Sequence, residues 1–290
     1  MASDNFRVSA IIPAYNSAAT VQRAIDSVLG QDFQGFEVIV VDDGSTDSTA
    51  QALKHYGERI RVVPQSNRGA AAARNAGVRV AFGEYLAFLD ADDEWLRGKL
   101  EIMVSALENA PQAVLAYSDF VTVSATGERS VKSPMIGSPS LDELLRAGVS
   151  FFPSAVVMRR SAFEACGGFC EEFPGAGFED SFMGLIARER GDFVHVARPL
   201  SVYHDASAPA LAAKYRHNYY VLLRMVRQRY GRRGRKFNST ARAFYASLLV
   251  AAAASHFRSR NLGKGLASIF EAMTVNPAYV ARALAGARYH

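Results

Sequence analysis

Residues 83–95 read GEYLAFLDADDEW, and this stretch sets the fold class of the chain. Tyr85 to Leu89 is a short apolar run, as expected for a strand that is buried on both faces. Two similar runs lie upstream, at Val8 to Ile12 and at Phe36 to Val41, and helical patterns separate the runs. Strands that alternate with helices indicate βαβ units, which build a parallel sheet with helices on both faces.

The remaining segments complete this pattern. Helices are expected over residues 18–29, 46–56, 69–80, 99–109 and 178–190. Further short strands are expected over residues 60–63, 114–117, 121–123, 154–158, 193–196 and 200–203. From Ala208 onward only helical patterns remain. We therefore predict an α/β domain over residues 1–207, with a mostly parallel central sheet flanked by helices, and a helical extension over residues 208–290.

Composition excludes several classes of protein. With 49% hydrophobic and 21% charged residues among 290, the chain has enough apolar surface for a full core, which excludes a disordered chain. The net charge of +5 is mild and unevenly spread, which does not fit a uniformly basic nucleic-acid binder. Cys166 and Cys170 are the only cysteines, too few for a disulfide framework or a four-cysteine zinc site.

No targeting or membrane-spanning segment is expected. Residues 1–8 are polar, so they do not resemble a signal peptide. The longest apolar run, Ala243 to Ala254, is shorter than the ~20 residues that a membrane span needs. We therefore expect a cytoplasmic protein.

The acidic loop after the predicted strand at 85–89 is the sharpest chemical signal. In parallel sheets, ligands bind beyond the carboxyl ends of the strands. Asp90-Ala91-Asp92 stands at such an end. Two carboxylates suit Mg²⁺ or Mn²⁺, which bind one or two protein carboxylates together with substrate phosphates and neutralise charge on a leaving diphosphate. The alternative is an acidic turn that caps the next helix.

The ends of the first two strands carry further candidates. Asp42 and Asp43 follow the second strand, where one carboxylate could accept hydrogen bonds from a nucleobase. The alternative is an Asp-Gly turn with a helix cap. Tyr15, in the run Pro13-Ala14-Tyr15-Asn16 after the first strand, could stack on a base, although a lone Tyr more often lies in a core.

A cation and two acids complete the set. Arg74 lies in a helix of small residues, where it could pair with phosphate or ribose oxygens or form a surface salt bridge. Glu179 and Asp180 open the helix predicted over residues 178–190, behind Gly-rich segments that include residues 174–177. Acids at that position either stabilise the helix dipole or take a proton from an attacking hydroxyl.

The order and spacing of these motifs resemble the family 2 glycosyltransferases. The resemblance spans roughly residues 6 to 205 and rests on VSAIIPAYNSAATVQRAIDSVLGQDFQGFEVIVVDDGSTDST (8–49), NRGAAAARNAG (67–77), GEYLAFLDADDEW (83–95), GGF (167–169) and FED (178–180). It implies a GT-A fold, with a nucleotide-binding half over residues 1–95 and an acceptor-binding half over residues 96–207. It also implies inverting transfer from a nucleotide sugar.

The resemblance also implies roles for single residues. Pro13 and Tyr15 match positions that line the base, and Asp43, beside Asp42, matches the carboxylate that reads uracil. Asp90 and Asp92 match the motif that holds the metal, Mn²⁺ or Mg²⁺, and the diphosphate, with Asp92 as the direct ligand.

Two further roles follow from the resemblance. Asp180 matches the catalytic base, with Glu179 as the second choice. His204 matches a position where some GT-A enzymes place another metal or phosphate contact, and its alternative is a surface or core histidine.

The expected function is transfer of one sugar per binding event from a nucleotide-sugar donor, UDP favoured, to a hydroxyl of a glycan or lipid-linked acceptor. Such a reaction belongs to the synthesis of cell-envelope polysaccharide or glycoconjugates. Processive relatives carry Gln-x-x-Arg-Trp, which Gln228-Arg229-Tyr230 does not match. The basic stretch 214–236 either contacts an anionic membrane or packs its apolar side on the catalytic domain.

Two other functions compete with this one. A sugar nucleotidyltransferase would share the architecture and the metal, but it predicts a Gly-rich loop directly after the first strand, where no glycine stands. A non-catalytic scaffold that binds nucleotide sugar or glycan is the third reading, and the intact Asp92 and Asp180 argue against it.

Overall fold

The computed structural model describes residues 6–124, 126–135, 137–147, 152–173, 177–204 and 208–284. The chain divides into two compact units. The sheet unit comprises Met1–Leu141, Val149–Gly175 and Glu179–Asp205, and the helical unit comprises Asp142–Gly148, Ala176–Phe178 and Ala206–His290. The domain boundary predicted at residue 207 falls on residues 205–207, which lie outside the described residues.

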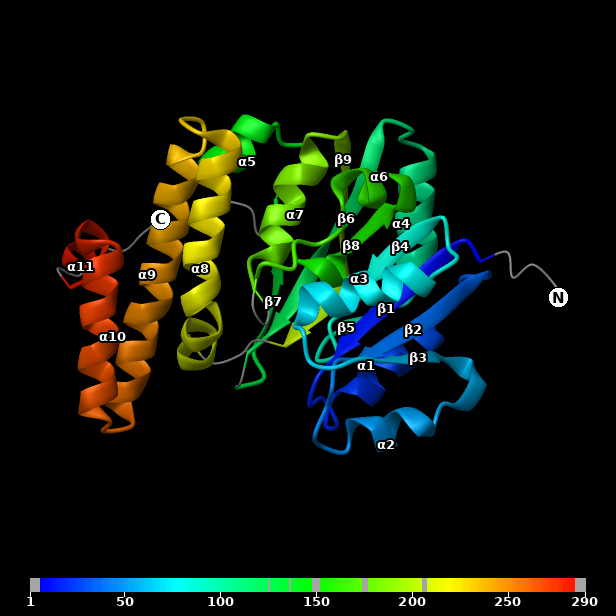
Figure 1. Cartoon of the computed structure of the whole chain (residues 1–290), viewed down its shortest axis with the longest axis horizontal. Coiled ribbons are helices and arrows are strands. Elements are labelled where there is room, and N and C mark those ends of the chain that lie inside the picture. Colours follow the sequence, from blue (N-terminus) through cyan, green and yellow to red (C-terminus); the bar gives the residue numbers. More distant parts are fainter. Residues whose placement is uncertain are drawn as a thin grey trace. The chain divides into compact units, whose positions relative to one another are not determined.

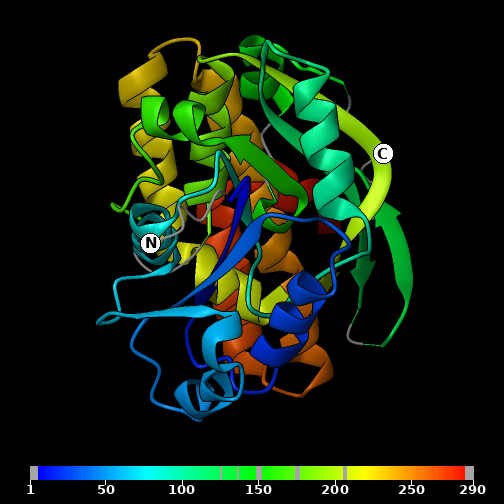
Figure 2. The ribbon, with the colours of Figure 1, turned by 90° about the vertical axis from the view of Figure 1, so that its right-hand side faces the viewer.

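The sheet unit is built on one sheet with the strand order β3-β2-β1-β4-β8-β6-β9-β5, and β7 pairs with β6 (Figures 1 and 2). The strands are β1 (Val8–Ala14), β2 (Phe36–Asp42), β3 (Arg61–Pro64), β4 (Tyr85–Phe88), β5 (Glu94–Trp95), β6 (Ala113–Val123), β7 (Arg129–Lys132), β8 (Val156–Arg159) and β9 (Asp192–His204). β3, β2, β1 and β4 pair in parallel, as does β6 with β9. β8 runs antiparallel to its neighbours β4 and β6. The α/β prediction is confirmed, and the unbroken parallel stretch lies in the N-terminal half.

Helices occur in all the predicted regions. Those of the sheet unit are α1 (Val21–Leu29), α2 (Thr49–Lys54), α3 (Ala70–Val80), α4 (Lys99–Glu108), α6 (Arg160–Cys166) and α7 (Glu179–Arg188), with short 3₁₀ turns η1 (Gly57–Arg59) and η2 (Pro153–Ala155). Those of the helical unit are α5 (Leu141–Ala147, whose first residue is assigned to the sheet unit), α8 (Ala208–Tyr230), α9 (Arg235–Arg258), α10 (Leu262–Val275) and α11 (Pro277–Leu284). Two of these helices, α5 and α6, were not predicted.

Helices cover both faces of the parallel strands. Alternate residues of β1 pack with α1 on one face, where Ile12 and Ile25 are fully buried. On the other face α3 lies very close to the sheet, because its small residues leave room. A Cβ on Gly77 would stand 2.5 Å from Cγ2 of Ile11, well inside van der Waals contact. This close approach brings the N-terminal part of α3, with Arg74, toward the carboxyl ends of β1 and β4.

Three sequence expectations about strands were wrong, and β5 and β7 were not predicted. The runs at 114–117 and 121–123 are one strand, β6, and the runs at 193–196 and 200–203 are one strand, β9. Polar residues interrupt the apolar pattern there, but the backbone stays extended, and the ladder absorbs the irregularity through register shifts around Asp119. The strand expected at 154–158 begins only at Val156, because Pro153–Ala155 forms η2.

The helical unit has a core of its own. Tyr219 of α8 stacks on Tyr245 of α9, with ring centroids 4.7 Å apart, and both side chains are buried. α10 leaves Leu266 and Phe270 exposed, at 63% and 74%. Among the described residues, no helix combines the length and the apolarity that a membrane crossing requires.

Candidate active site

The loops after β1, β2 and β4 meet at one edge of the sheet. β1 lies between β2 and β4 and runs parallel to both, so the carboxyl ends of the three strands are neighbours. The three polar clusters that the sequence placed after these strands are therefore brought together, as expected from the rule for parallel sheets.

Asn16 joins the first two of these loops. Its backbone is in the left-handed region, with φ of 48°. The side-chain oxygen accepts hydrogen bonds from the backbone N–H groups of Thr46 (2.8 Å) and Asp47 (3.3 Å), and its own N–H donates to Ser45 Oγ (3.0 Å). Asn16 thus holds the loop after β1 against the loop after β2, and we call the edge formed by the loops after β1, β2 and β4 the rim. The neighbouring Tyr15 is 49% exposed, so its ring is accessible and not part of a core.

Asp43 is buried and already holds three hydrogen bonds. Oδ1 accepts from Gln65 Nε2 (2.6 Å) and from the N–H of Arg68 (2.9 Å), and Oδ2 accepts from the N–H of Gly69 (2.8 Å). A carboxylate offers about four acceptor positions, so roughly one remains for a base. The sequence did not predict that the Asp43 carboxylate also fixes the loop between β3 and α3 through these hydrogen bonds.

Asp42 and Pro13 lie within the ladder itself. Pro13 pairs with Val41 and Ala14 pairs with Asp42, so both strands extend slightly beyond their predicted ends. The Asp42 carboxylate accepts a hydrogen bond from the N–H of Ser45 (3.0 Å), which is the Asp-Gly turn that the sequence allowed as an alternative.

Arg74 is the centre of a buried ionic cluster. One terminal nitrogen lies 2.6 Å from Asp90 Oδ1 and the other lies 2.8 Å from Glu179 Oε1. The guanidinium also stands over the ring of Phe169, 5.2 Å from its centroid. Burial alone would lower the pKa of Arg74, but the charges of Asp90 and Glu179 raise it above its ordinary value.

This arrangement gives Arg74 partners that the sequence did not predict. The sequence suggested that its guanidinium pairs with phosphate or ribose oxygens, or forms a surface salt bridge. In the structure the side chain is 2% exposed and both terminal nitrogens bind carboxylates of the protein. Arg74 therefore connects the acidic loop after β4 to the first turn of α7.

The same cluster separates the two candidate bases. Glu179 is 2% exposed and bound to Arg74, whereas Asp180 is half-buried. Burial, and next the charge of Glu179, raise the pKa of Asp180 to about 7. Phe178, directly before α7, has φ of 71°, a conformation that bulky residues rarely adopt. The geometry favours Asp180 over Glu179 as a proton acceptor, since a base needs access and a pKa near the working pH.

The three aspartates after β4 have different surroundings. Asp92 is exposed and Asp90 is half-buried, whereas Asp93 is fully buried. Ser154 Oγ donates to Asp93 Oδ2 at 2.6 Å, and the N–H of His204 donates to Oδ1 at 3.3 Å. Burial, followed by the charges of Asp90 and Asp92, raises the pKa of Asp93 well above its ordinary value.

Asp93 is a residue that the sequence reasoning missed. It holds η2 and the end of β9 against the acidic loop. Trp95 supports the same contact, because its Nε1 donates to the carbonyl of Ser154 at 3.0 Å. The sequence shows adjacent carboxylates, but loop residues have no periodicity that tells which of them faces inward.

Asp90 and Asp92 fit a hard divalent cation. Their carboxylates stand on one short loop, and Mg²⁺ or Mn²⁺ completes its shell with phosphate oxygens and water. The described residues contain no group of three or more His, Cys, Asp or Glu side chains placed to hold a metal. His204 Nε2 lies 2.8 Å from Glu94 Oε1, so the structure gives the predicted third ligand a different partner.

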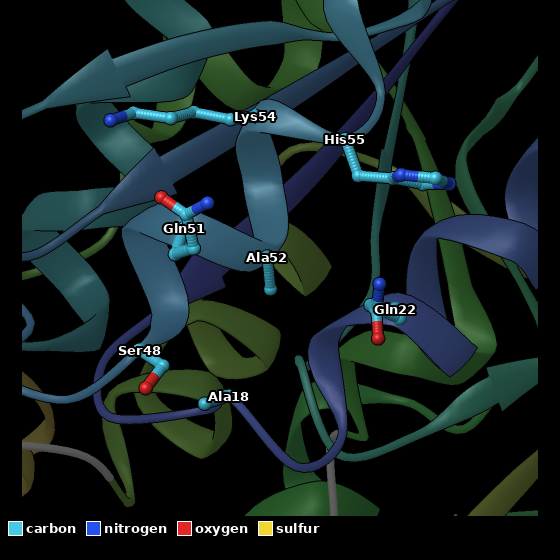
Figure 3. Close-up of a pocket in the computed structure, with 7 residues that line it drawn as sticks. All are labelled: Ala18, Gln22, Ser48, Gln51, Ala52, Lys54 and His55. Carbon is cyan, nitrogen blue, oxygen red and sulfur yellow. The ribbon is translucent and has the colours of Figure 1, made fainter.

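A separate depression lies between α1 and α2 (Figure 3). Its volume is about 450 Å³, and it is lined by Ala18, Gln22, Ser48, Gln51, Ala52, Lys54 and His55. None of these residues is a carboxylate or a predicted site residue. The candidate active site is therefore the rim formed by the three loops.

A family model described as glycosyl transferase family 2 matches residues 9–167, which is more than half of the chain. The chain belongs to this family. The motifs predicted this family, and the membership sets aside the nucleotidyltransferase reading.

Curated relatives match about a third of this chain. The putative teichuronic acid biosynthesis glycosyltransferase TuaG of Bacillus subtilis is 47% identical over 98 residues, 32% of this chain and 39% of the relative. UDP-Glc:alpha-D-GlcNAc-diphosphoundecaprenol beta-1,3-glucosyltransferase WfgD of Escherichia coli is 40% identical over 106 residues, 36% of this chain and 42% of the relative. The chain thus spans less than half of the length of either relative.

Solved structures match over nearly the whole chain. The crystal structure of S. aureus TarS 1-349 is similar with a TM-score of 0.61 over 98% of this chain and 93% of that one, at 18% identity. At this identity the likeness shows the fold, so the GT-A architecture is confirmed.

Proposed function

We propose that this glycosyltransferase transfers a sugar from a UDP-sugar to a hydroxyl of a lipid-linked or glycan acceptor, with inversion and without processive elongation. The observation that carries the proposal is the Arg74 cluster. It joins Asp90, in the acidic loop, to Glu179, so the neighbouring Asp180 opens its helix beside the loop proposed to hold the donor diphosphate.

The relatives supply the rest of the support. Structures of TarS 1-349 in complex with UDP and with UDP-GlcNAc favour a UDP-sugar donor. The name of WfgD describes a diphosphoundecaprenol acceptor, and the name of TuaG describes teichuronic acid biosynthesis. We infer that the reaction serves the synthesis of a cell-envelope polysaccharide.

The proposed chemistry is a single displacement. Asp180 takes the proton of the acceptor hydroxyl, the hydroxyl oxygen bonds to the anomeric carbon, and the bond between that carbon and the diphosphate oxygen breaks on the opposite face. A pKa of about 7 suits this role, because the carboxylate is ionised in part at neutral pH and is basic enough to accept a proton.

A divalent cation would complete the donor site. Asp92, with Asp90 beside it, would hold Mn²⁺ or Mg²⁺, which supplies positive charge to the departing diphosphate. Tyr15 offers an exposed ring for the base, and Asp43 offers one remaining acceptor position.

Calorimetry with UDP, GDP and dTDP, each with and without Mn²⁺, tests the donor assignment. We expect UDP to bind in the presence of metal, and Asp92→Asn to weaken that binding by at least tenfold. The matched control is Asp32→Asn, which removes an exposed carboxylate that pairs with exposed Arg97. Equal binding of UDP by the wild type and Asp92→Asn would contradict the proposed metal site.

Turnover tests the acceptor and the stereochemistry. With UDP-glucose or UDP-GlcNAc and a diphosphoundecaprenol-linked acceptor, we expect one sugar per product in the anomeric configuration opposite to that of the donor. Retention of the anomeric configuration, observed by NMR, would exclude the single displacement.

A further inference from the structure

The helical unit carries a large excess of positive charge. Between Ala206 and His290 the sequence holds fifteen Lys and Arg residues but only one acidic residue, Glu271, and the segment Asp142–Gly148 of the same unit adds Asp142, Glu143 and Arg146. The Glu271 carboxylate accepts a hydrogen bond from the Tyr245 hydroxyl at 2.9 Å. The carboxylates of these helices therefore cannot balance the excess, and an external anion is the natural partner for it.

Part of this charge gathers around a hollow where α8 ends and α9 begins. The hollow has a volume of about 570 Å³, and we call it the arginine groove; it is lined by Arg227, Gly231, Arg232, Arg235, Ser239 and Arg242. The α9 members are four and three positions apart, so they share one face of that helix. Four guanidinium groups and one hydroxyl thus line one concave surface.

Three of these guanidinium groups are not paired with any carboxylate of the described residues. In the part of the chain that the structure describes, Arg227, Arg232 and Arg235 form no ion pair. The adjacent Arg233 does, because its terminal nitrogen lies 2.8 Å from Asp142 Oδ1. Like charges in one hollow repel each other, and an anion that binds between them removes this repulsion.

We propose that the arginine groove binds a phosphate or diphosphate group, carried either by an anionic lipid headgroup or by a free phosphorylated compound. Guanidinium forks match phosphate oxygens in pairs, and such charge-assisted hydrogen bonds are about twice as strong as neutral ones. The Ser239 hydroxyl supplies a further donor. This site lies in the helical unit and shares no residue with the proposed donor site, so it goes beyond the proposed function.

Calorimetry with inorganic pyrophosphate in EDTA tests the groove directly. Without a divalent cation the acidic loop after β4 repels pyrophosphate, so binding reports the arginine groove. We expect Arg232→Gln/Arg235→Gln to weaken binding by about tenfold or more for each guanidinium removed. Arg232→Lys/Arg235→Lys keeps the positive charge but loses the guanidinium fork, so its affinity for pyrophosphate should lie between those of the wild type and Arg232→Gln/Arg235→Gln.

The matched control removes the same charge elsewhere in the helical unit. Arg258→Gln/Lys264→Gln changes two exposed cations at the junction of α9 and α10. We expect it to keep pyrophosphate binding within about twofold of the wild type, since distant exposed charges are largely screened at ~0.15 M salt. Equal weakening by this control and by Arg232→Gln/Arg235→Gln would overturn the groove in favour of a general charge effect, and so would absence of pyrophosphate binding by the wild type.

Vesicle sedimentation distinguishes the two sources of phosphate. If the source is a lipid headgroup, the protein sediments with phosphatidylglycerol vesicles and not with phosphatidylcholine vesicles, and Arg232→Gln/Arg235→Gln abolishes sedimentation. If the source is a free compound, the variants lose pyrophosphate binding and no form sediments. Sedimentation that survives in Arg232→Gln/Arg235→Gln but is lost in Leu266→Ser/Phe270→Ser would assign lipid binding to α10 and overturn a headgroup in the groove.

The proposed donor site and the proposed phosphate binding by the arginine groove can be refuted independently of each other. The groove variants should bind UDP and Mn²⁺ as the wild type does, because the residues changed lie outside the donor site. Loss of UDP binding in Asp92→Asn with intact pyrophosphate binding in EDTA would support the donor site and leave the groove standing.

Discussion

Lys99, the first residue of α4, is predicted to destabilise the folded protein. Its side chain is fully buried, and among the described residues its Nζ has no hydrogen-bond partner. The nearest compensation is the ring of Trp95, whose centroid lies 5.6 Å from Nζ. Burial lowers the pKa of Lys99 to about 7, from an ordinary value of 10.5.

The magnitude follows from proton linkage. Between pH 7 and pH 10.5 the unfolded chain keeps the proton of Lys99 while the folded chain loses it, so stability rises with pH across this window. Below pH 7 both states are protonated and the whole penalty is present. At 1.36 kcal/mol per pH unit, the stability lost by burying protonated Lys99 is at most about 5 kcal/mol at pH 6, and this loss falls to about 2 kcal/mol at pH 9.

Lys99→Met removes the charge and keeps most of the volume. We expect urea denaturation to show that the variant is more stable than the wild type by several kcal/mol at pH 6, and that this difference shrinks by about 3 kcal/mol at pH 9. Lys54→Met, at an exposed position of α2, is the control and should change stability by less than about 0.5 kcal/mol at both pH values. A Lys99→Met variant that is less stable than the wild type, or whose advantage is the same at both pH values, would refute the reasoning.

Three further predictions concern the site and its support. In pre-steady-state assays of the chemical step, the rate should fall as the pH drops through about 7, because the pKa of Asp180 is raised and the base must be ionised. Asp180→Asn should lower that rate by about 10²–10⁴ while UDP binding is kept, and a rate that is independent of pH between 5 and 9 would remove Asp180 from this role. Arg74→Met leaves the carboxylates of Asp90 and Glu179 without their cation, so thermal unfolding should show that the free energy of unfolding falls by about 3–5 kcal/mol. Arg74→Lys should recover part of this stability. Equal stability of Arg74→Met and the wild type would contradict the buried ionic cluster. Gly77→Ala places a methyl group 2.5 Å from Cγ2 of Ile11, so α3 must move, and the free energy of unfolding should fall by about 1–3 kcal/mol. The matched control Gly263→Ala, where a Cβ meets nothing within 4 Å, should have little effect on stability. A Gly77→Ala protein as stable as the wild type would show that α3 can shift freely.

The sequence by itself determined the order of strands and helices from β1 to β4 and the edge of the sheet where the polar loops lie. Apolar runs of strand length, separated by helical patterns, are enough for a parallel sheet, and the polar residues after Ala14, Val41 and Leu89 then share one edge. The start of α8 at Ala208 was also predicted, because only helical patterns remain from that residue onward.

The tertiary structure alone decided which partner each polar side chain takes. Spacing does not reveal that Asp93 turns inward while Asp92 turns outward, since loop residues have no fixed periodicity. Nor does it reveal that Arg74 binds Glu179, which is 105 positions away in the chain. Such contacts depend on how segments distant in sequence pack together. A pattern of neighbouring residues does not show which distant segments come into contact.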